Sequence, residues 1–255
     1  MKRVVVKVGS AVLTQGDSVA LERMQALVDF LVELKKSNEV ILVSSGAVAA
    51  GYTKLQLDRS VLQNKQALAS IGQPVLMHKY ATKFQEHDII ISQVLVTAAN
   101  FNKSEDIVRI KNTVDTLLSN GVIPIVNEND ATATEELVVG DNDQLSAYIT
   151  KHTDSDILII LSDIDAYYDE DPHKNKDANV LKIVSIIDEC ALEKEATPHG
   201  NFATGGIVTK LKAASYLLNF GIDMFLASGY DLSDVKSYMI DANHKGGTLF
   251  TSGKN

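Results

Sequence analysis

Residues 1–14 read M-K-R-V-V-V-K-V-G-S-A-V-L-T. The valines at positions 4, 5, 6 and 8 form a nearly continuous apolar run that is typical of a strand covered on both faces. Gly9-Ser10 then turns the chain. Lys7 interrupts the run, although lysine is among the residues least often fully buried. Either its ammonium group reaches solvent at the end of the strand, or the strand places it beside an anion.

Six more short apolar runs predict further buried strands. They lie at residues 40–43, 89–96, 122–126, 157–161, 181–187 and 224–227. Helices are predicted between them, at residues 21–36, 75–85, 104–119 and 207–220. Pro74 is expected to open the second of these helices, Ser104 to cap the third and Gly221 to end the fourth. Such strand–helix repetition predicts an α/β protein, a three-layer αβα sandwich with a mostly parallel central sheet.

The bulk composition is typical of a soluble globular protein. Of the 255 residues, 45% are hydrophobic and 22% are charged, and the net charge of −9 argues against nucleic acid as the main partner. The single cysteine, Cys190, allows no intrachain disulfide, and no apolar stretch reaches the roughly 20 residues of a membrane span. No signal-peptide pattern precedes the first strand, so we expect a cytoplasmic protein without membrane contact. The six histidines are scattered, which argues against a protein-built zinc site.

Small or polar residues follow five of the predicted strands. These segments are Gly9-Ser10, Ser44-Ser45-Gly46-Ala47, Asn127-Glu128-Asn129-Asp130, Ser162-Asp163 and Ser228-Gly229. Ligands bind at the carboxyl ends of parallel strands. We therefore expect all five segments to face one crevice.

Three glycine-containing turns, at residues 9–10, 44–47 and 204–206, are candidate sites for an anion, because backbone N–H groups can approach it there. Each alone is more often a tight connection, but three of them in one α/β chain favour a phosphate-rich ligand. The sequence has neither a G-x-x-x-x-G-K-[ST] motif nor a G-x-G-x-x-G motif. A bound nucleotide would therefore need a different kind of site.

Two lysines lie next to these turns. Lys7 precedes the first turn, and Lys210 lies about one helical turn into the helix that follows residues 204–206. Two ammonium groups from opposite ends of the chain would stabilise the negative charge that develops during phosphoryl transfer. The alternative for each lysine is a stem that lies along apolar surface with its charge in solvent.

Acidic and amide side chains gather in two segments, Asp141-Asn142-Asp143 and Asn127-Glu128-Asn129-Asp130. A helix N-cap explains one aspartate of the first segment, and a polar turn is the ordinary explanation of the second. Each segment holds more polar groups than those roles need. The carboxylates are therefore candidates to orient the two lysines, to contact Mg²⁺ or to bind a substrate ammonium group.

Together these segments resemble the amino-acid kinase family along nearly the whole chain. The matching stretches are V-V-V-K-V-G-S-A-V-L-T at 4–14, V-S-S-G-A-V-A-A-G at 43–51, P-I-V-N-E-N-D-A-T-A-T at 124–134, V-G-D-N-D-Q-L-S-A at 139–147 and T-G-G-I-V-T-K-L-K-A-A at 204–214. The resemblance implies the fold of that family and phosphoryl transfer from ATP with Mg²⁺. N-E-N-D-A and V-G-D-N-D are similar to the members that convert L-glutamate to L-glutamyl 5-phosphate, the first step of proline biosynthesis.

The resemblance also implies the site residues. Lys7 and Lys210 would stabilise the transferring phosphoryl group, and Asp143 would hold both lysines in place. Glutamate binding is implied for Ser45, Gly46, Ala47, Asn127, Asp130, Asp141 and Asn142. ATP binding is implied for Lys7, Gly9, Ser10, Ser162, Asp163, Tyr168, Thr204, Gly205, Gly206, Ile207, Val208, Thr209 and Lys210. Mg²⁺ is expected mainly through the ATP phosphates, without a metal site built from side chains.

We expect one amino-acid kinase domain over residues 1–255, with an acceptor-binding lobe at about 1–153 and a nucleotide-binding lobe at about 154–255. Many bacterial relatives carry a C-terminal PUA domain, which we expect this chain to lack. The expected partners are L-glutamate and ATP, a second copy in a homo-oligomer (a dimer or tetramer), and a glutamyl-phosphate reductase. Two alternatives stay open. One is a kinase of the same fold for acetylglutamate, aspartate, carbamate or a nucleoside monophosphate, and the other is a non-catalytic amino-acid or nucleotide sensor.

Overall fold

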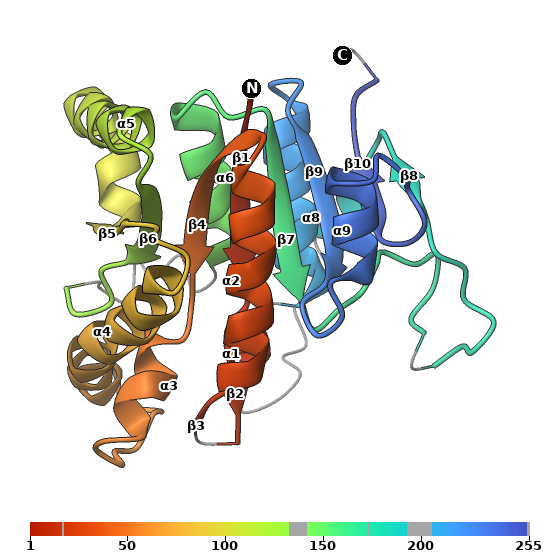
Figure 1. Ribbon diagram of the computed structural model, residues 1–255. Helices are drawn as coiled ribbons and strands as arrows, with labels where there is room; N and C mark the ends of the chain where they lie inside the picture. The colour runs from red at the N-terminus through yellow and green to blue at the C-terminus, as the bar shows by residue number, and fades with distance from the viewer. Residues whose placement is uncertain (17, 133–141, 173, 193–205, 254–255) are drawn as a thin grey trace.

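The computed structural model describes residues 1–16, 18–132, 142–172, 174–192 and 206–253, and within these ranges the chain folds around one large sheet (Figure 1). Its strands are β1 (Lys2–Val8), β4 (Asn38–Ser44), β5 (Ile91–Val96), β6 (Ile123–Glu128), β7 (Ile157–Ser162), β8 (Ile183–Val184), β9 (Asp223–Ser228) and β10 (Thr248–Phe250). A separate antiparallel pair is formed by β2 (Thr14–Gln15) and β3 (Ser18–Val19).

The strand order in the large sheet is β5-β6-β4-β1-β7-β9-β10-β8. All neighbours from β5 to β9 are parallel, β10 runs antiparallel to β9, and β8 is parallel to β10. The central strand β1 pairs with β4 on one side and β7 on the other, so the two halves of the chain share one sheet. The prediction of a mostly parallel sheet is confirmed.

Helices cover both faces of the sheet. They are α1 (Ser10–Leu13), α2 (Leu21–Lys35), α3 (Ala47–Tyr52), α4 (Leu62–Gln85), the 3-10 helix η1 (Ala98–Asn102), α5 (Ser104–Ser119), α6 (Asn142–His152), α7 (Glu189–Leu192), α8 (Ile207–Leu218) and α9 (Ser233–Met239). Helices α2, α4 and α9 pack on one face, and α5, α6 and α8 on the other, which gives three layers (Figure 1). Within the described ranges, no helix combines the length and the apolar character that a bilayer crossing requires.

The alternation of β1 decides where Lys7 points. Val4, Val6 and Val8 belong to the core on the α2 side, and Val5 belongs to the core on the α6 and α8 side. Successive strand residues point to opposite faces. Lys7 therefore shares the face of Val5, and its side chain is 5% exposed. The solvent-exposed alternative for this lysine is wrong.

Two helix ends differ from the predictions. Pro74 does not open a helix but lies inside α4, which begins at Leu62. An interior proline costs about 3 kcal/mol, but Leu68, Ala69 and Gly72 are buried on the preceding turns and offset that cost. Ser104 is the first residue of α5, and Lys103 occupies the cap position.

Two strands at the far edge of the sheet also differ from the predictions. The strand predicted at residues 181–187 shortens to β8, because its partner is the three-residue β10. The sequence analysis did not predict β10, since T-L-F is too short to show a period. The predicted end of α8 is confirmed, because Gly221 has a φ of +70° and its N–H donates to Leu218 O at 3.0 Å.

Helices α3 and α4 cross at unusually short range, and two glycines permit it. A Cβ atom at Gly72 would lie 1.8 Å from Ala47 O, and one at Gly51 would lie 1.9 Å from Leu68 O. No neighbour can yield at such distances, because the opposing atoms are backbone. The crossing fixes the start of α3, and with it the turn that ends β4.

We expect Gly72→Ala to lower the free energy of unfolding by about 3 kcal/mol or more, at the upper end of overpacking effects. Helix propensity alone would give the opposite sign, a gain of about 1 kcal/mol for alanine over glycine. Urea unfolding of the variant and the parent measures the difference. A neutral or stabilising result would mean that the helices can separate without cost, contrary to the packing described above.

Candidate active site

The five polar segments predicted to lie together follow neighbouring parallel strands. Strands β6, β4, β1, β7 and β9 are consecutive and parallel, so the polar segments that follow them share one edge, which is the lower edge in Figure 1. Hydrogen bonds join neighbouring ends: Gly9 N–H donates to Leu161 O at 3.0 Å, and Gly229 N–H donates to Ser162 O at 2.7 Å. The expectation that these segments lie at one edge of the sheet is confirmed, and that they face one crevice stays a prediction.

Two buried lysines meet on one carboxylate at this edge. Lys7 donates to Oδ1 of Asp143, and Lys210 Nζ lies 3.1 Å from Oδ2. The residues are 4%, 2% and 0% exposed for Lys7, Lys210 and Asp143. Burying a charged group without a partner costs free energy. The two lysines can therefore be buried here only because the carboxylate pairs with them. The solvated alternative is therefore wrong for Lys210 as well.

Each member of this charged group comes from a different element. Lys7 lies near the end of β1, Asp143 is the second residue of α6, and Lys210 is in the first turn of α8. The position of Asp143 near the amino end of α6 favours its negative charge, because the helix dipole is positive there. Since α6 and α8 pack side by side, the first turns of both helices face the end of β1. Two ammonium groups held close together suit an anionic ligand.

Thr209 has a second role that the sequence analysis did not identify. Its hydroxyl donates to Asp143 Oδ2 at 3.0 Å, and it also lies 2.9 Å from Gly206 O. The resemblance implied only that this residue contacts ATP. No spacing in the sequence could show the contact, because Thr209 and Asp143 belong to helices that only the fold brings together.

A second cluster joins the ends of β4 and β6 to α6. Asn142 Nδ2 donates to Ser44 O at 3.0 Å, to Ser45 Oγ at 2.9 Å and to Asn127 Oδ1 at 3.0 Å. Asn127 is buried, with 2% of its surface exposed. Gly46, which follows Ser45, has a φ of +101° and precedes the first residue of α3, Ala47. Five of the residues implied for glutamate binding, Ser45, Gly46, Ala47, Asn127 and Asn142, thus lie around one turn.

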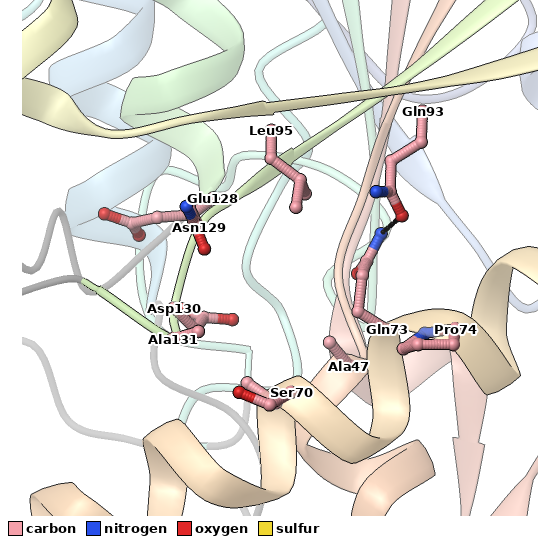
Figure 2. A pocket seen from close by; sticks show the side chains of 11 residues that line it. Ala47, Ser70, Gln73, Pro74, Gln93, Leu95, Glu128, Asn129, Asp130 and Ala131 are labelled. Carbon is pink, nitrogen blue, oxygen red and sulfur yellow. Dashed lines mark hydrogen bonds between the residues drawn. The ribbon is translucent and has the colours of Figure 1, made fainter.

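A cavity of about 180 Å³ opens beside this cluster (Figure 2). Its lining comes from α3, α4, β5, β6 and the segment after β6: Ala47, Ala69, Ser70, Gln73, Pro74, Gln93, Leu95, Glu128, Asn129, Asp130 and Ala131. Figure 2 shows Asp130 on one side and Gln73, hydrogen-bonded to Gln93, on the other. The cavity is below the usual range of drug-sized ligand pockets, about 300–1,000 Å³, and suits a molecule of amino-acid size.

Asp130 belongs to the cavity lining and has a carboxyl group with a raised pKa. Burial raises its pKa from 3.8 to about 6, because a low-dielectric environment disfavours the charged form. A half-buried carboxylate of this kind gains from a cationic ligand. The sequence analysis included Asp130 among the implied residues but gave no sign of its environment.

The residues implied for nucleotide binding lie on the β7 and α8 side. Ser162 Oγ donates to Asp163 Oδ1 at 2.8 Å at the end of β7, and Gly206, Ile207 and Val208 lead into α8. Ser10 begins α1, directly after Gly9. The Tyr168 hydroxyl donates to Asp165 Oδ2 at 3.1 Å. Both residues belong to the loop after β7, so the contact that orients the tyrosine comes from within the loop.

Three implied residues, Asp141, Thr204 and Gly205, lie outside the described residues. Across the described part of the chain, no three His, Cys, Asp or Glu side chains converge as metal ligands. Gln73 and Gln93 line the cavity without having been predicted. A glutamine in a helix and another in a strand carry no motif, and only the packing of α4 against β5 brings them together.

Comparison with known proteins identifies the scaffold. The model of the amino acid kinase family matches residues 2–228. The chain is 49% identical over 252 residues to a glutamate 5-kinase of Leishmania donovani, covering 99% of this chain and 96% of that protein. It is also 49% identical to a glutamate 5-kinase of Wolinella succinogenes, with 99% of both chains covered.

Solved structures with the same fold are far more distant in sequence. A carbamate kinase from Giardia lamblia bound to AMP-PNP superposes with a TM-score of 0.66 at 17% identity, covering 98% of both chains. A UMP kinase from Bacillus anthracis gives a TM-score of 0.65 at 15% identity, covering 99% of this chain and 96% of that one. At such identities the likeness establishes the fold alone.

Proposed function

The chain belongs to the amino acid kinase family, and from this premise we propose that it phosphorylates the side-chain carboxylate of L-glutamate with ATP. The observation that carries the proposal is the 49% identity, over nearly the full length, to relatives that are glutamate 5-kinases. The two buried lysines on Asp143, next to a cavity of amino-acid size, support it independently.

The reaction needs no general base. A side-chain carboxylate oxygen of glutamate attacks the γ-phosphorus of ATP and forms a new P–O bond. The bond between that phosphorus and the bridging oxygen breaks, and its electron pair leaves with ADP. The product is L-glutamyl 5-phosphate, and no proton moves in the step. The main obstacle is that two anions must meet, so positioning and positive charge supply most of the catalysis.

We assign this charge stabilisation to Lys7 and Lys210. Asp143 contacts both ammonium groups and keeps them at one edge of the sheet. Because Asp143 uses both of its oxygens in these contacts, it is a poor ligand for Mg²⁺. We propose that Mg²⁺ enters with the ATP phosphates and supplies further positive charge there.

The acceptor side is proposed to bind glutamate through several groups. The Asp130 carboxylate would pair with the α-ammonium group, and the Ser45 hydroxyl and the backbone at Gly46 and Ala47 would donate to carboxylate oxygens. Asn127, Asp141 and Asn142 complete the proposed acceptor set. Asn142 already contacts both Ser45 and Asn127 at the end of β4.

The nucleotide side is proposed to lie along the ends of β1 and β7 and the start of α8. Gly9 and Ser10 would place backbone N–H groups near the phosphates. The remaining proposed contacts are Ser162, Asp163, Tyr168 and residues 204–210. This division gives the acceptor to the half before about residue 153 and ATP to the half after it, within one domain of about 1–255.

We expect glutamate binding to weaken as the pH falls through the raised pKa of Asp130, about 6. The carboxyl group pairs with an ammonium group only when ionised, so the Kd for glutamate should rise about tenfold between pH 7 and pH 5. Isothermal calorimetry across this range measures the change. A Kd that stays constant down to pH 5 would contradict the ammonium contact.

Asp130→Asn provides the control for this pH dependence. The variant should bind glutamate weakly at every pH, and a plot of its Kd against pH should lack the inflection near pH 6. Since burial raises the pKa of Asp130 in the folded state, ionisation above that pKa costs stability in the unliganded protein. The variant should therefore melt at a higher temperature than the parent at pH 7 and lose this advantage at pH 4.

ATP turnover with Mg²⁺, with and without L-glutamate and with hydroxylamine present, tests the proposed function. Glutamate-dependent release of ADP together with a hydroxamate supports it, because hydroxylamine traps an acyl phosphate. Turnover that is faster with acetylglutamate, aspartate, carbamate or a nucleoside monophosphate would assign another acceptor. Binding without turnover for every acceptor would favour a sensor.

The product suggests the partners. An acyl phosphate hydrolyses readily, so we propose that a glutamyl-phosphate reductase consumes it. We also propose a homo-oligomer, because long helices such as α2 and α4 offer large faces for a second copy. Loss of the acyl phosphate on addition of such a reductase tests the first proposal, and sedimentation of the purified chain tests the second.

A further inference from the structure

A row of four amide side chains runs from the acceptor site to the edge strand. Asn142 Nδ2 donates to Asn127 Oδ1 at 3.0 Å, Asn127 Nδ2 donates to Gln73 Oε1 at 2.9 Å, and Gln73 Nε2 donates to Gln93 Oε1 at 2.9 Å. The last of these bonds is drawn in Figure 2. The row crosses α6, β6, α4 and β5, and we call it the amide row.

Backbone groups fix the direction of the amide row. The N–H of Glu128, which can only donate, lies 2.9 Å from Asn127 Oδ1. The carbonyl oxygen of Ser44, which can only accept, lies 3.0 Å from Asn142 Nδ2. These two contacts decide which end of each asparagine amide is oxygen and which is nitrogen. Asn127 must then turn its NH₂ group toward Gln73, and Gln73 must present its oxygen.

We propose that Gln73 is a positioning residue for the acceptor site, which it serves by holding Asn127, and through it Asn142, in this one orientation. Gln73 and Asn127 are 8% and 2% exposed. If Gln73 lost its oxygen, the buried NH₂ group of Asn127 would lose its acceptor, which costs free energy. A rotation of the Asn127 side-chain amide would relieve that cost. That rotation would break the contact with Asn142.

The orientation has a consequence for substrate choice. Asn142 shares its two amide hydrogens among Ser44 O, Ser45 Oγ and Asn127 Oδ1. Its Oδ1 atom, like any amide oxygen, can only accept a hydrogen bond. The Ser45 hydroxyl accepts from Asn142 and keeps its own hydrogen to donate. With Asp130, the site then combines acceptors for an ammonium group with a donor for a carboxylate. This chemistry selects a free α-amino acid over an N-acylated one.

This inference rests on the proposed function, because it concerns how the acceptor site is held. Gln73→Met keeps the length of the side chain and removes both hydrogen-bonding functions. We expect the Kd for glutamate to rise about tenfold and the KM for ATP to stay within about twofold. The preference in kcat/KM for glutamate over acetylglutamate should also shrink. Gln85→Met is the matched control, because Gln85 is an exposed glutamine at the end of the same helix.

An unchanged Kd and an unchanged preference in Gln73→Met, with a lower melting temperature only, would overturn the proposal. It would show that Gln73 supports packing and nothing more. Equal effects in Gln73→Met and Gln85→Met would overturn it as well, because the second residue has no place in the amide row.

A second measurement needs no substrate. In the unliganded, ¹⁵N-labelled protein, the side-chain NH₂ of Asn127 should exchange slowly with water. Gln73→Glu keeps an oxygen for Asn127, and the exposed Gln93 can turn its NH₂ group to the new carboxylate. Slow exchange should therefore persist in Gln73→Glu and be lost in Gln73→Met. Loss in both variants, or in neither, would overturn the proposal.

The two measurements separate this proposal from the proposed function. If the wild-type chain turns over no glutamate but the exchange pattern holds, the function fails and the amide row stands. If glutamate is phosphorylated but the side-chain NH₂ exchange of Asn127 does not change when Gln73 is substituted, the function stands and the positioning role fails.

Discussion

Asp143→Asn will lower the free energy of unfolding by about 3 to 5 kcal/mol and bring kcat close to the background rate. The carboxylate is fully buried, and both Lys7 and Lys210 contact it. Removing one partner of a buried ionic group leaves the other charges without their main compensation, and that range is typical of the penalty. Turnover falls as well, because both ammonium groups lose the carboxylate that orients them.

Urea unfolding and steady-state kinetics measure the two effects of this substitution. Glu105→Gln serves as the control, since Glu105 is also an acid in the first turn of a helix but its side chain is 81% exposed. It should change stability by less than about 0.5 kcal/mol. Retained stability in Asp143→Asn, within about 1 kcal/mol of the parent, would contradict the account of the charged group.

The same reasoning separates stability from function. A buried ionic group can often be replaced by apolar side chains of similar volume without loss of stability. The triple variant Lys7→Met, Asp143→Leu, Lys210→Met should therefore be at least as stable as the parent, and so more stable than Asp143→Asn, and have no activity. That outcome would mean that the fold carries this charged group for phosphoryl transfer and gains no stability from it.

The sequence was informative where a local pattern has one physical solution. The valines around Lys7 predict a buried strand, and Gly221 predicts the end of a helix, because few residues tolerate a positive φ. Strand β10 escaped prediction because three residues show no period. The prediction that Pro74 opens a helix was wrong, because burial of the turns before it outweighs the lost hydrogen bond. That burial depends on packing against α3, which the local sequence pattern does not reveal.

The candidate site divides in the same way. Lys7, Lys210 and Asp143 were candidates because of their places beside glycine turns and in an acidic segment, and the family resemblance implied their roles. The contact of Thr209 with Asp143 and the amide row through Gln73 were not identifiable. Threonine and glutamine are common on helices, and only the packing of α6, α8, α4 and β5 gives these two residues their partners.

Lys210→Ala should reduce kcat about a thousandfold and leave the KM for glutamate within about threefold of the parent. The ammonium group is needed most when charge develops on the transferring phosphoryl group, and losing one such donor typically costs about 10²–10³ in rate. The proposed acceptor residues Asp130, Ser45 and Asn142 keep their geometry, because none of their described contacts involves α8. Steady-state kinetics with glutamate and ATP varied separately measures both constants.

Two further variants decide what this loss of rate means. Lys210→Met fills the volume that alanine leaves empty, so an equal loss of kcat in both variants assigns the effect to the missing charge and not to a cavity. Lys212→Ala, two residues along the same helix and exposed, should leave kcat unchanged. If Lys210→Ala raised only the KM for glutamate, Lys210 would bind the acceptor in the ground state. The charge stabilisation would then rest on Lys7 alone, because Lys210 would contribute equally before and during phosphoryl transfer.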